Sequence, residues 1–215
     1  MKKVIFLAGL FGLSNLMVQA APSDQTQYNT QKQRVADIFS KPIQLETERL
    51  ILRKVKDSDI EDIFEYAKNP LVTSLTGWVE HKDKKDSRRF IDKIRRGYES
   101  NEYLYLVVED KELNKVVGSA AVIHISPEKT SSELSLSLAE SHWGSGYGSE
   151  IMRRMIQFGF EVMGFDFLAG YVFPEHIGSN KMVKRVGMQF LNQRLYPWLI
   201  RDVHPVLNYY EIQPK

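Results

Sequence analysis

Three glycines at a spacing of two residues are the clearest chemical feature of this chain. They lie in Ser141-His142-Trp143-Gly144-Ser145-Gly146-Tyr147-Gly148-Ser149-Glu150, between an alternating segment, residues 132–138, and a segment with helically spaced apolar residues. A turn from a strand into a helix leaves backbone N–H groups unpaired, and the helix dipole is positive at the same point. Glycine also lets a ligand approach the backbone because it has no Cβ. The pattern indicates a site for a pyrophosphate or another anion.

The same glycines also fit a tight turn without any ligand, and their spacing alone does not separate the two interpretations. Two nucleotide-binding motifs can be excluded. The dinucleotide fingerprint G-x-G-x-x-G requires a glycine where this chain has Ser149, and the Gly-Lys-Ser/Thr ending of Walker A does not follow. If the turn binds a phosphate, we therefore expect a different phosphate-bearing ligand.

The segments around the turn predict alternating strands and helices. Helical patterns open near Ser58, cover 85–98, run from the glycine turn to about Met163, and cover 179–186. Strand patterns cover 45–53, 103–109, 116–125, 132–138, 165–173, 188–196 and 206–212. This order predicts an α/β chain with the glycine turn in the middle of the sheet, where ligand clefts form.

Composition excludes several classes of protein. The chain has 215 residues, of which 43% are hydrophobic and 26% are charged, as in one globular domain with a full core. It has no cysteine, so disulfides, cysteine-ligated metal sites and thiol nucleophiles are excluded. A net charge of +2 gives no argument for a nucleic-acid partner, and the basic residues of 85–98 are interpreted as a solvated helix face.

Residues 1–20 have the pattern of a secretory signal peptide. Lys2 and Lys3 precede an apolar run, residues 4–18, and Val18-Gln19-Ala20 has the small-x-small ending of a cleavage site. The run is short for a transmembrane helix, and we expect no stable span in the mature chain. An uncleaved anchor and a misassigned start remain alternatives. Cleavage would leave 27 basic and 27 acidic residues.

The compartment follows from the fate of this segment. A cleaved signal would make the protein periplasmic or secreted, whereas a segment that does not function as a signal would leave it cytoplasmic. Residues 21–44 are polar and are predicted to be a flexible linker with a helical turn around 35–39. The folded domain is predicted to cover 45–215.

Four stretches together resemble the GNAT acetyltransferase superfamily, and within it the branch similar to the Rim-type ribosomal-protein N-terminal acetyltransferases. These stretches are Leu45–Arg53, Asn69-Pro70 with Gly77-Trp78, Trp143–Glu150, and Pro174–Asn180 followed by Val186-Gly187-Met188. The resemblance covers about 45–212. It implies an α/β GNAT-like fold, with a mixed, mostly antiparallel central sheet of about seven strands flanked by helices. It also implies acetyl-CoA as donor, an amine as acceptor, no metal, and a monomer or homodimer.

The resemblance further implies where acetyl-CoA would bind. The pyrophosphate would lie against the backbone of Trp143, Gly144, Ser145, Gly146, Tyr147, Gly148 and Ser149. The pantetheine arm would lie along Leu136, Ser137 and Leu138, with an N–H near Leu138 polarising the thioester carbonyl. His176, Ser179 and Asn180 of the second cofactor motif complete the predicted site.

Two residues are the predicted catalytic groups. Glu133 matches an acidic residue that the family often carries on this strand, and the resemblance implies that it would remove the amine proton through water; a surface carboxylate is the alternative. Ser179 matches the serine of the family's N-x-x-S motif and would protonate the CoA thiolate, or open the helix as an N-cap, or do both. The tyrosine that acts as acid in many relatives corresponds to Val183 here.

Three departures from the family pattern bear on activity. His176 stands in place of the family's asparagine, Ser145 in place of a basic residue, and Gly187-Met188 in place of Gly-Phe. A catalytically weak CoA-binding sensor or interaction module is therefore an alternative to a working N-acetyltransferase, and an unrelated nucleotide-binding enzyme is a third hypothesis. A protein N-terminus, a polyamine or an aminoglycoside-like drug would each fit as acceptor. The aromatic candidates for that side of the cleft, otherwise core residues, are Trp78, Tyr196, Trp198 and Tyr209.

Overall fold

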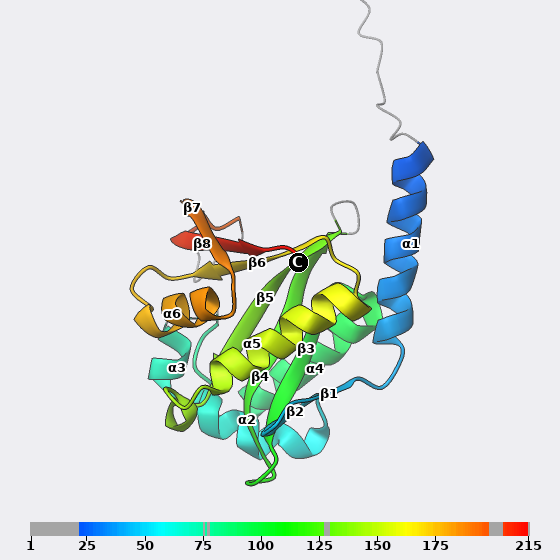
Figure 1. Ribbon diagram of the computed structural model, residues 1–215. Helices are drawn as coiled ribbons and strands as arrows, with labels where there is room; N and C mark the ends of the chain where they lie inside the picture. Colours follow the sequence, from blue (N-terminus) through cyan, green and yellow to red (C-terminus); the bar gives the residue numbers. More distant parts are fainter. Residues whose placement is uncertain (1–21, 75, 77, 127–129, 198–203, 215) are drawn as a thin grey trace, which may run out of the picture.

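The computed structural model describes residues 22–74, 76, 78–126, 130–197 and 204–214, so the predicted signal segment lies outside the described residues. In this part of the chain, strands form one sheet in the order β1-β2-β3-β4-β5-β6-β8-β7 (Figure 1). The strands are β1 (Gln44–Glu46), β2 (Leu50–Arg53), β3 (Leu104–Asp110), β4 (Lys115–Ser126), β5 (Ser131–Leu138), β6 (Phe167–Val172), β7 (Gln189–Leu195) and β8 (Val206–Ile212). Every neighbouring pair is antiparallel except β5 with β6.

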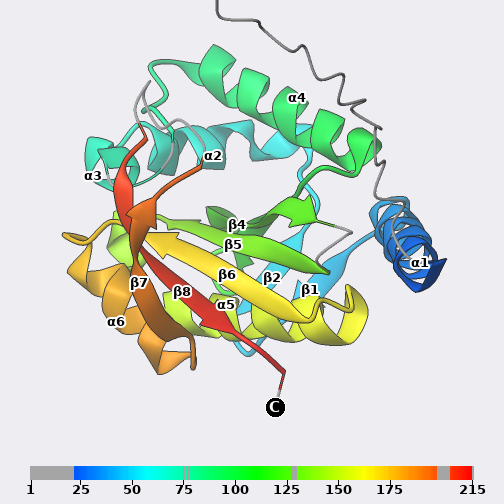
Figure 2. The same cartoon turned by 90° about the horizontal axis from the view of Figure 1, so that it is seen from above.

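Helices cover both faces of this sheet (Figure 2). One face carries α2 (Ile60–Ala67), which follows the 3₁₀ turn Asp57–Asp59, and α4 (Lys84–Ser100), with the short α3 (Pro70–Ser74) beside them. The other face carries α5 (Tyr147–Gln157), continued by the π-helical turn Phe158–Val162, together with α1 (Pro22–Phe39) and α6 (Ile177–Arg185). The resulting mixed α/β fold confirms the predicted class, with eight strands where about seven were expected.

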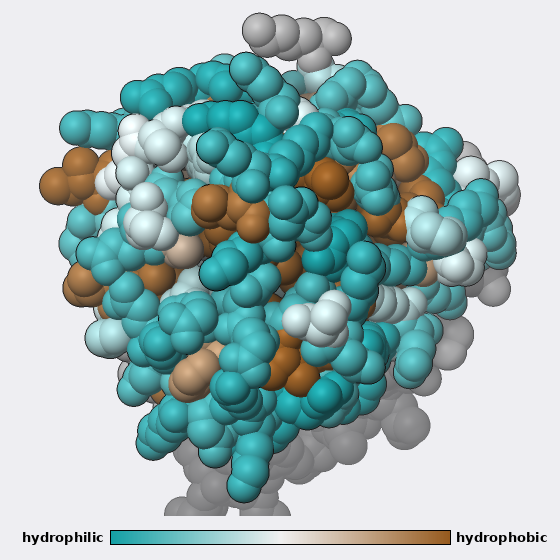
Figure 3. All heavy atoms as spheres, turned by 90° about the horizontal axis from the view of Figure 1, so that it is seen from below, coloured by the Kyte–Doolittle hydropathy of each residue, from teal (hydrophilic) through white to brown (hydrophobic). Residues whose placement is uncertain are grey.

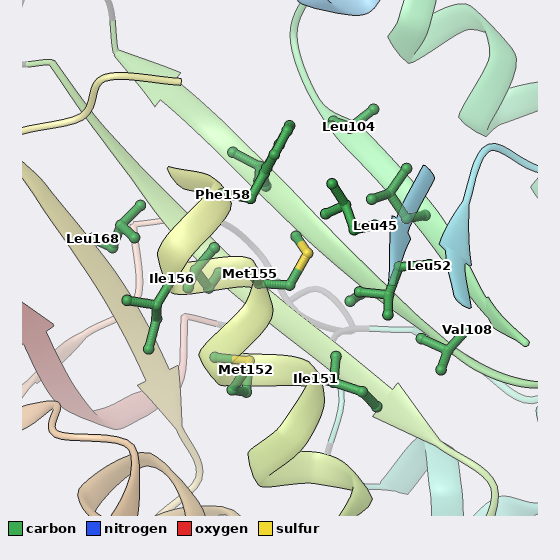
Figure 4. Packing of buried hydrophobic residues seen from close by; sticks show 14 of the residues in the cluster. Leu45, Leu52, Leu104, Val108, Ile151, Met152, Met155, Ile156, Phe158 and Leu168 are labelled. Atoms are coloured by element: carbon green, nitrogen blue, oxygen red, sulfur yellow. The ribbon is translucent and has the colours of Figure 1, made fainter. Parts of the chain in front are cut away.

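The glycine turn is anchored by the helix that follows it. Ile151, Met152, Met155 and Ile156 recur at helical spacing, and all four are buried. They belong to the same buried cluster as side chains of the sheet such as Leu52, Val108 and Leu168 (Figure 4). Each such buried side chain contributes about 1.5–3 kcal/mol relative to an exposed one. The start of α5 is therefore held at a fixed height above the strands.

The strands β5 and β6 separate soon after they begin to pair. Their parallel register covers only Ser131–Glu133 against Phe167–Ala169, while β5 stays paired with β4 up to Leu138. On its other side β6 pairs with β8 from Leu168 to Val172. A gap therefore opens inside the sheet, beside the second half of β5.

Alternation along β5 divides its side chains between two environments. Leu134 and Leu138 belong to the core under α5. Glu133 and Ser137 therefore face the α2 and α4 side, where the Trp78 indole donates to the Ser137 hydroxyl at 3.2 Å. The one strand thus contributes polar groups to one face of the sheet and apolar groups to the other.

The N-terminal helix α1 corrects the prediction of a flexible linker for residues 21–44. Val35 and Phe39 are buried in the main core, with Ile38 packed against it. Gln31 is also buried, and its side-chain amide donates to the carbonyl of Met163 at 2.9 Å. These contacts stabilise a helix whose polar composition alone indicates a linker. The domain boundary at residue 45 remains a prediction.

The predicted first strand, 45–53, is a hairpin of β1 and β2 rather than one strand. Thr47 makes the turn, because its N–H donates to the carbonyl of Leu50 at 3.0 Å and its hydroxyl accepts the Leu50 N–H at 3.0 Å.

Seen from below, the surface is mostly hydrophilic with small, separate hydrophobic patches (Figure 3). Within the described residues, no helix combines the length and apolar character that crossing a membrane requires.

Candidate functional site

The glycine turn has the backbone geometry that binds anions. Gly144 and Gly146 have φ values of 75° and 89°, in the left-handed region that favours glycine. Gly146 is the N-cap of α5, and the Glu150 N–H donates to its carbonyl at 3.1 Å. The N–H groups of 147–149 precede this bond, so they have no partner within the helix. The turn can therefore present several N–H groups and a helix dipole to one negatively charged ligand.

A cavity of about 320 Å³ lies beside this turn, and we call it the glycine cleft. Lys181 and Arg185 of α6 line it opposite the turn and add positive charge. A Cβ on Gly148 would lie 3.6 Å from both Leu136 and Met182, so glycine keeps this side of the cleft open. A phosphate-bearing ligand with a slender apolar arm fits these residues. The predicted residues that line the cleft are Leu136, Ser137, Leu138, Trp143, Gly144, Gly146, Gly148, Ser149, His176 and Ser179.

The backbone of Leu138 faces the gap between β5 and β6. The next residue, Ala139, donates its N–H to the carbonyl of Val117 in β4 at 2.7 Å. Successive residues of a strand direct their backbone groups to opposite sides, so Leu138 directs its N–H and C=O away from β4. The Leu138 carbonyl accordingly accepts the Trp143 indole N–H at 2.8 Å. Its N–H can serve as a hydrogen-bond donor at the predicted reaction centre.

A second cavity, of about 360 Å³, extends from the gap to the α4 side of the sheet. We call it the Glu133 pocket after the carboxylate that lines it. The two cavities are neighbours, because five residues line both. The residues that line both are Thr76, Leu136, His176, Ser179 and Met182.

The Glu133 carboxylate is held by two side chains. Glu133 is 9% exposed, and its Oε2 lies 3.0 Å from Nδ1 of His124. The Tyr196 hydroxyl donates to the two carboxylate oxygens at 3.0 and 3.2 Å. Burial and the charge of Glu133 raise the pKa of Tyr196, so this hydroxyl keeps its proton. These contacts fix the carboxylate and still leave acceptor capacity, since two carboxylate oxygens can accept about four hydrogen bonds.

His124 has an unusual backbone conformation next to this carboxylate. Its φ is 50°, and it lies at a register shift of β4 between Ile123 and Ser126. Bulges of this kind redirect a side chain, and residues in strained conformations cluster at functional sites. The bulge brings the imidazole to Glu133. Sequence reasoning missed His124 because a single histidine in an apolar strand carries no signal of a bulge.

His176 opens the helix that carries Ser179. Its side chain caps α6, with Nδ1 accepting the Ser179 N–H at a long 3.4 Å. Burial lowers the pKa of His176, partly opposed by the nearby Glu175 charge, and a neutral ring can act as this acceptor. Ser179 itself lines both cavities. The first turn of α6 therefore brings a hydroxyl to the junction of the two cavities.

Three predicted binding residues direct their side chains elsewhere. The Ser145 hydroxyl donates to the carbonyl of His142 at 2.6 Å, and the Tyr147 hydroxyl donates to Asp110 at 2.7 Å. The Asn180 amide donates to the carbonyls of Phe173 and His176, each at 2.9 Å. Its oxygen also accepts from Asn208 and Tyr210, so Asn180 ties α6 to β6 and β8. Ser145 and Tyr147 still contribute backbone to the turn.

An ion pair that sequence reasoning missed supports the turn from below. Arg49 donates through Nε to Glu150 at 2.8 Å and through Nη1 to the carbonyl of Ser145 at 3.1 Å. The guanidinium also lies 4.1 Å from the centroid of the Tyr147 ring. Glu150 accepts the Thr47 hydroxyl at 2.6 Å and the Arg49 N–H at 3.0 Å. The hairpin of β1 and β2 is thus fastened to the glycine turn.

Among the described residues, no group of three or more His, Cys, Asp or Glu side chains is arranged to hold a metal ion. Of the aromatic residues singled out in the sequence, Trp78 and Tyr196 line the Glu133 pocket. Tyr209 is buried against Tyr171, and Trp198 lies outside the described residues.

Comparison with known proteins agrees with this arrangement. The model of the acetyltransferase (GNAT) domain matches residues 49–189. The uncharacterized N-acetyltransferase YoaA of Bacillus subtilis (strain 168) is 25% identical over 155 residues, which cover 71% of this chain and 88% of that protein. The uncharacterized N-acetyltransferase p20 of Bacillus licheniformis is 28% identical over 148 residues, which cover 67% of this chain and 82% of that protein.

Solved structures show the same fold. An acetyltransferase of the GNAT family from Bacillus anthracis has a TM-score of 0.68 at 21% identity, covering 80% of this chain and 98% of its own. Spermidine N-acetyltransferase from Vibrio cholerae, solved with CoA and spermine, has a TM-score of 0.66 at 17% identity, covering 78% of this chain and 96% of its own. Since the family model spans more than half of the sequence, this chain belongs to the GNAT acetyltransferase family and is an acetyl-CoA-dependent N-acetyltransferase.

Proposed function

We propose that the protein transfers the acetyl group of acetyl-CoA to a primary amine by direct attack, with Glu133 as base and Ser179 as acid. One observation carries this proposal. Glu133 and Ser179 line a single pocket that shares walls with the cleft at the glycine turn. A carboxylate and a hydroxyl thereby border one cavity.

The glycine cleft supplies the groups that would hold acetyl-CoA. The first N–H groups of α5 would bind the pyrophosphate, and Lys181 and Arg185, which line the same cavity, would balance its negative charge. Leu136 and Leu138 would border the pantetheine arm, and the Leu138 N–H would donate to the thioester carbonyl. Bound acetyl-CoA supplies an activated acetyl group. The residues of the chain would supply the base, the oxyanion donor and the acid.

Glu133 would make the amine nucleophilic. An alkylamine has a pKa near 10.4, so at pH 7 it carries a proton that must leave before attack. Glu133 accepts this proton, directly or through water, while Tyr196 and His124 hold the carboxylate in place. The Leu138 N–H stabilises the negative charge that develops on the carbonyl oxygen. Ser179 gives its hydroxyl proton to the departing thiolate, and the second proton that the attacking nitrogen loses restores the Ser179 hydroxyl through solvent.

The test combines binding and turnover in residues 21–215. Calorimetric titration should give roughly micromolar affinity for acetyl-CoA, about −8 kcal/mol, with ATP and NAD as controls. Glu133→Gln should lower kcat/KM for an amine by about 10²–10⁴-fold, the usual range for a general base. Its affinity for acetyl-CoA should change less than threefold. Ser179→Ala should lower kcat by about tenfold.

Glu99→Gln is the matched control, because Glu99 is an exposed carboxylate at the end of α4 and lines neither cavity. Its kinetics should equal those of the wild type. Wild-type kcat/KM in Glu133→Gln would exclude Glu133 as the base.

A CoA-binding module with weak catalysis is the second candidate function. It is favoured by His176, whose imidazole caps α6 where the family carries an asparagine, and by Ser145, which brings no positive charge to the turn. Binding of acetyl-CoA without turnover of any amine would support this function. Turnover of even one amine above the rate of acetyl-CoA hydrolysis would exclude it.

A further inference from the structure

The Glu133 pocket has a composition that selects one kind of amine. We infer that the acceptor is a small amine with a single ammonium group on a flat apolar body, such as an arylalkylamine. This inference rests on the proposed function, since it names the acceptor class of the same pocket.

One wall of the pocket is a cluster of three aromatic rings. Trp78 lies in the loop after α3, Phe90 in α4 and Tyr105 in β3. The rings of Trp78 and Phe90 are stacked, with centroids 6.1 Å apart at 19°. Phe90 meets Tyr105 edge to face at 5.9 Å and 82°. Contact with each other and with the core fixes these rings, so they form a preformed surface.

The opposite wall is a second aromatic cluster. Tyr171 and Phe173 extend from β6, and Tyr196 follows β7. The rings of Tyr171 and Tyr196 meet edge to face, with centroids 4.8 Å apart at 65°. A flat ring can pack against either wall in an offset or edge-to-face arrangement, which stabilises aromatic pairs beyond simple burial. The two walls therefore favour a planar apolar body.

The carboxylate lies between these two walls on the same face of the sheet. Tyr105 pairs through Ala121 with Ser135 of β5, two residues from Glu133. On the other side Glu133 is aligned with Ala169, two residues from Tyr171. Residues two apart on a strand share a face. An ammonium at Glu133 thus carries its apolar body directly between the aromatic walls.

The charges of the pocket favour one ammonium group over several. Among the described lining residues, Glu133 is the single carboxylate, and Lys93 of α4 adds a positive charge. Burial raises the pKa of Tyr105 to about 12 and also raises that of Tyr171, so neither ring supplies a negative charge at pH 7. A second ammonium of a polyamine would meet Lys93 without a carboxylate of its own. The cavity of about 360 Å³ also lies near the small end of ligand sites, about 300–1,000 Å³.

The test compares four acceptors with one donor. Release of CoA thiol gives kcat/KM for 2-phenylethylamine, n-butylamine, spermidine and a seryl-alanine dipeptide. The kcat/KM for 2-phenylethylamine should be at least tenfold higher than that for n-butylamine, which lacks the aromatic ring. It should exceed the kcat/KM for spermidine and for the dipeptide by a similar factor. Preference for spermidine or for the dipeptide overturns the inference and leaves the proposed function standing.

Two variants test the walls and the charge separately. Phe90→Leu keeps an apolar side chain but removes a ring, and it should lower the advantage of 2-phenylethylamine over n-butylamine at least threefold. Lys93→Glu should raise kcat/KM for spermidine at least fivefold. Lys85→Glu, an exposed residue of the same helix outside the pocket, is the control and should leave this value unchanged. An unchanged ratio in Phe90→Leu would refute the role of the aromatic walls.

Calorimetry separates this inference from the proposed function. 2-Phenylethylamine should bind the protein at least tenfold more tightly than spermidine, whether or not the acetyl group is transferred. Binding of 2-phenylethylamine without any turnover would contradict the proposed reaction and support the acceptor class. Tighter binding of spermidine would overturn the acceptor class.

Discussion

Replacing Arg49 by glutamine tests how the glycine turn is held in place. Arg49 makes two contacts with Glu150, of 2.8 Å through Nε and 2.7 Å through Nη2, and a third with the carbonyl of Ser145. It also covers the Tyr147 ring. Glutamine keeps part of the side-chain volume but loses the charge and the forked geometry. Glu150 would retain the Thr47 hydroxyl and the backbone N–H of residue 49.

The expected magnitude follows from these contacts and their exposure. A hydrogen bond to a charged group contributes about 1.5–3 kcal/mol when well buried. The Arg49 side chain is 39% exposed and that of Glu150 is 17% exposed, so solvent screening reduces this value. We expect Arg49→Gln to lower the free energy of unfolding by about 1–2 kcal/mol. Because the turn loses its support, KM for acetyl-CoA should rise roughly fivefold to tenfold, and a tenfold change corresponds to about 1.4 kcal/mol.

Urea denaturation and acetyl-CoA kinetics at pH 7 measure the two effects. Burial raises the pKa of Glu150, but the hydrogen bonds from Thr47 and Arg49 outweigh it and lower this pKa overall. The stability that depends on the Glu150 charge is therefore present above the ordinary glutamate pKa. It is lost as the pH falls through the lowered value. The difference between wild type and Arg49→Gln should accordingly shrink on acidification.

Arg88→Gln is the control, because Arg88 pairs with Asp57 on the surface and both side chains are about half exposed. It should change stability by no more than about 0.5 kcal/mol and leave KM unchanged. An unchanged KM for acetyl-CoA in Arg49→Gln would refute the idea that this ion pair positions the turn, even if stability fell.

Two further substitutions test the cleft and the helix that opens at its edge. Gly148→Val should weaken acetyl-CoA binding at least tenfold in calorimetry. A Cβ at this position already contacts Leu136 and Met182, so the two added methyl groups would enter the cleft. Unchanged affinity would contradict this geometry. Burial lowers the pKa of His176 in the folded protein, so acid protonates this residue more readily in the unfolded chain. The stability that its contact with Ser179 contributes is therefore lost as the pH falls below about 6.5. The Tm of His176→Asn should therefore fall less than that of the wild type between pH 7.5 and 5.5. Equal decreases in Tm would contradict the role of His176 as the cap.

The elements next to the glycine turn were predictable because their patterns are local. Alternation in 132–138 fixes β5, and the helical spacing of apolar residues after Gly148 fixes α5. The family resemblance then supplied the fold and the donor. The helix α1 was not predictable in this way, because Val35 and Phe39 make a short apolar stripe whose partners lie far along the chain. A polar segment with so little apolar surface is typical of a linker until its docking site is known.

The candidate site shows a similar division. A sequence motif identifies the turn and its backbone but not the direction of each side chain, and the hydroxyls of Ser145 and Tyr147 bond to His142 and Asp110. The contact of His124 with Glu133 depends on a bulge, and the aromatic walls depend on how several elements meet. Such contacts arise only from tertiary structure. The assignment of Glu133 as base and Ser179 as acid remains a prediction for kinetics to test.

The early separation of β5 from β6 leaves two strand edges open inside the sheet. Exposed edges ordinarily attract other chains, and proteins protect them. Here an arm with amide groups, such as pantetheine, can complete the ladder as an added strand does in peptide recognition. A ligand that binds only the folded state stabilises it by about 2.7 kcal/mol at one hundred times its Kd. Bound acetyl-CoA would therefore slow proteolysis of the protein wherever its concentration is well above its Kd.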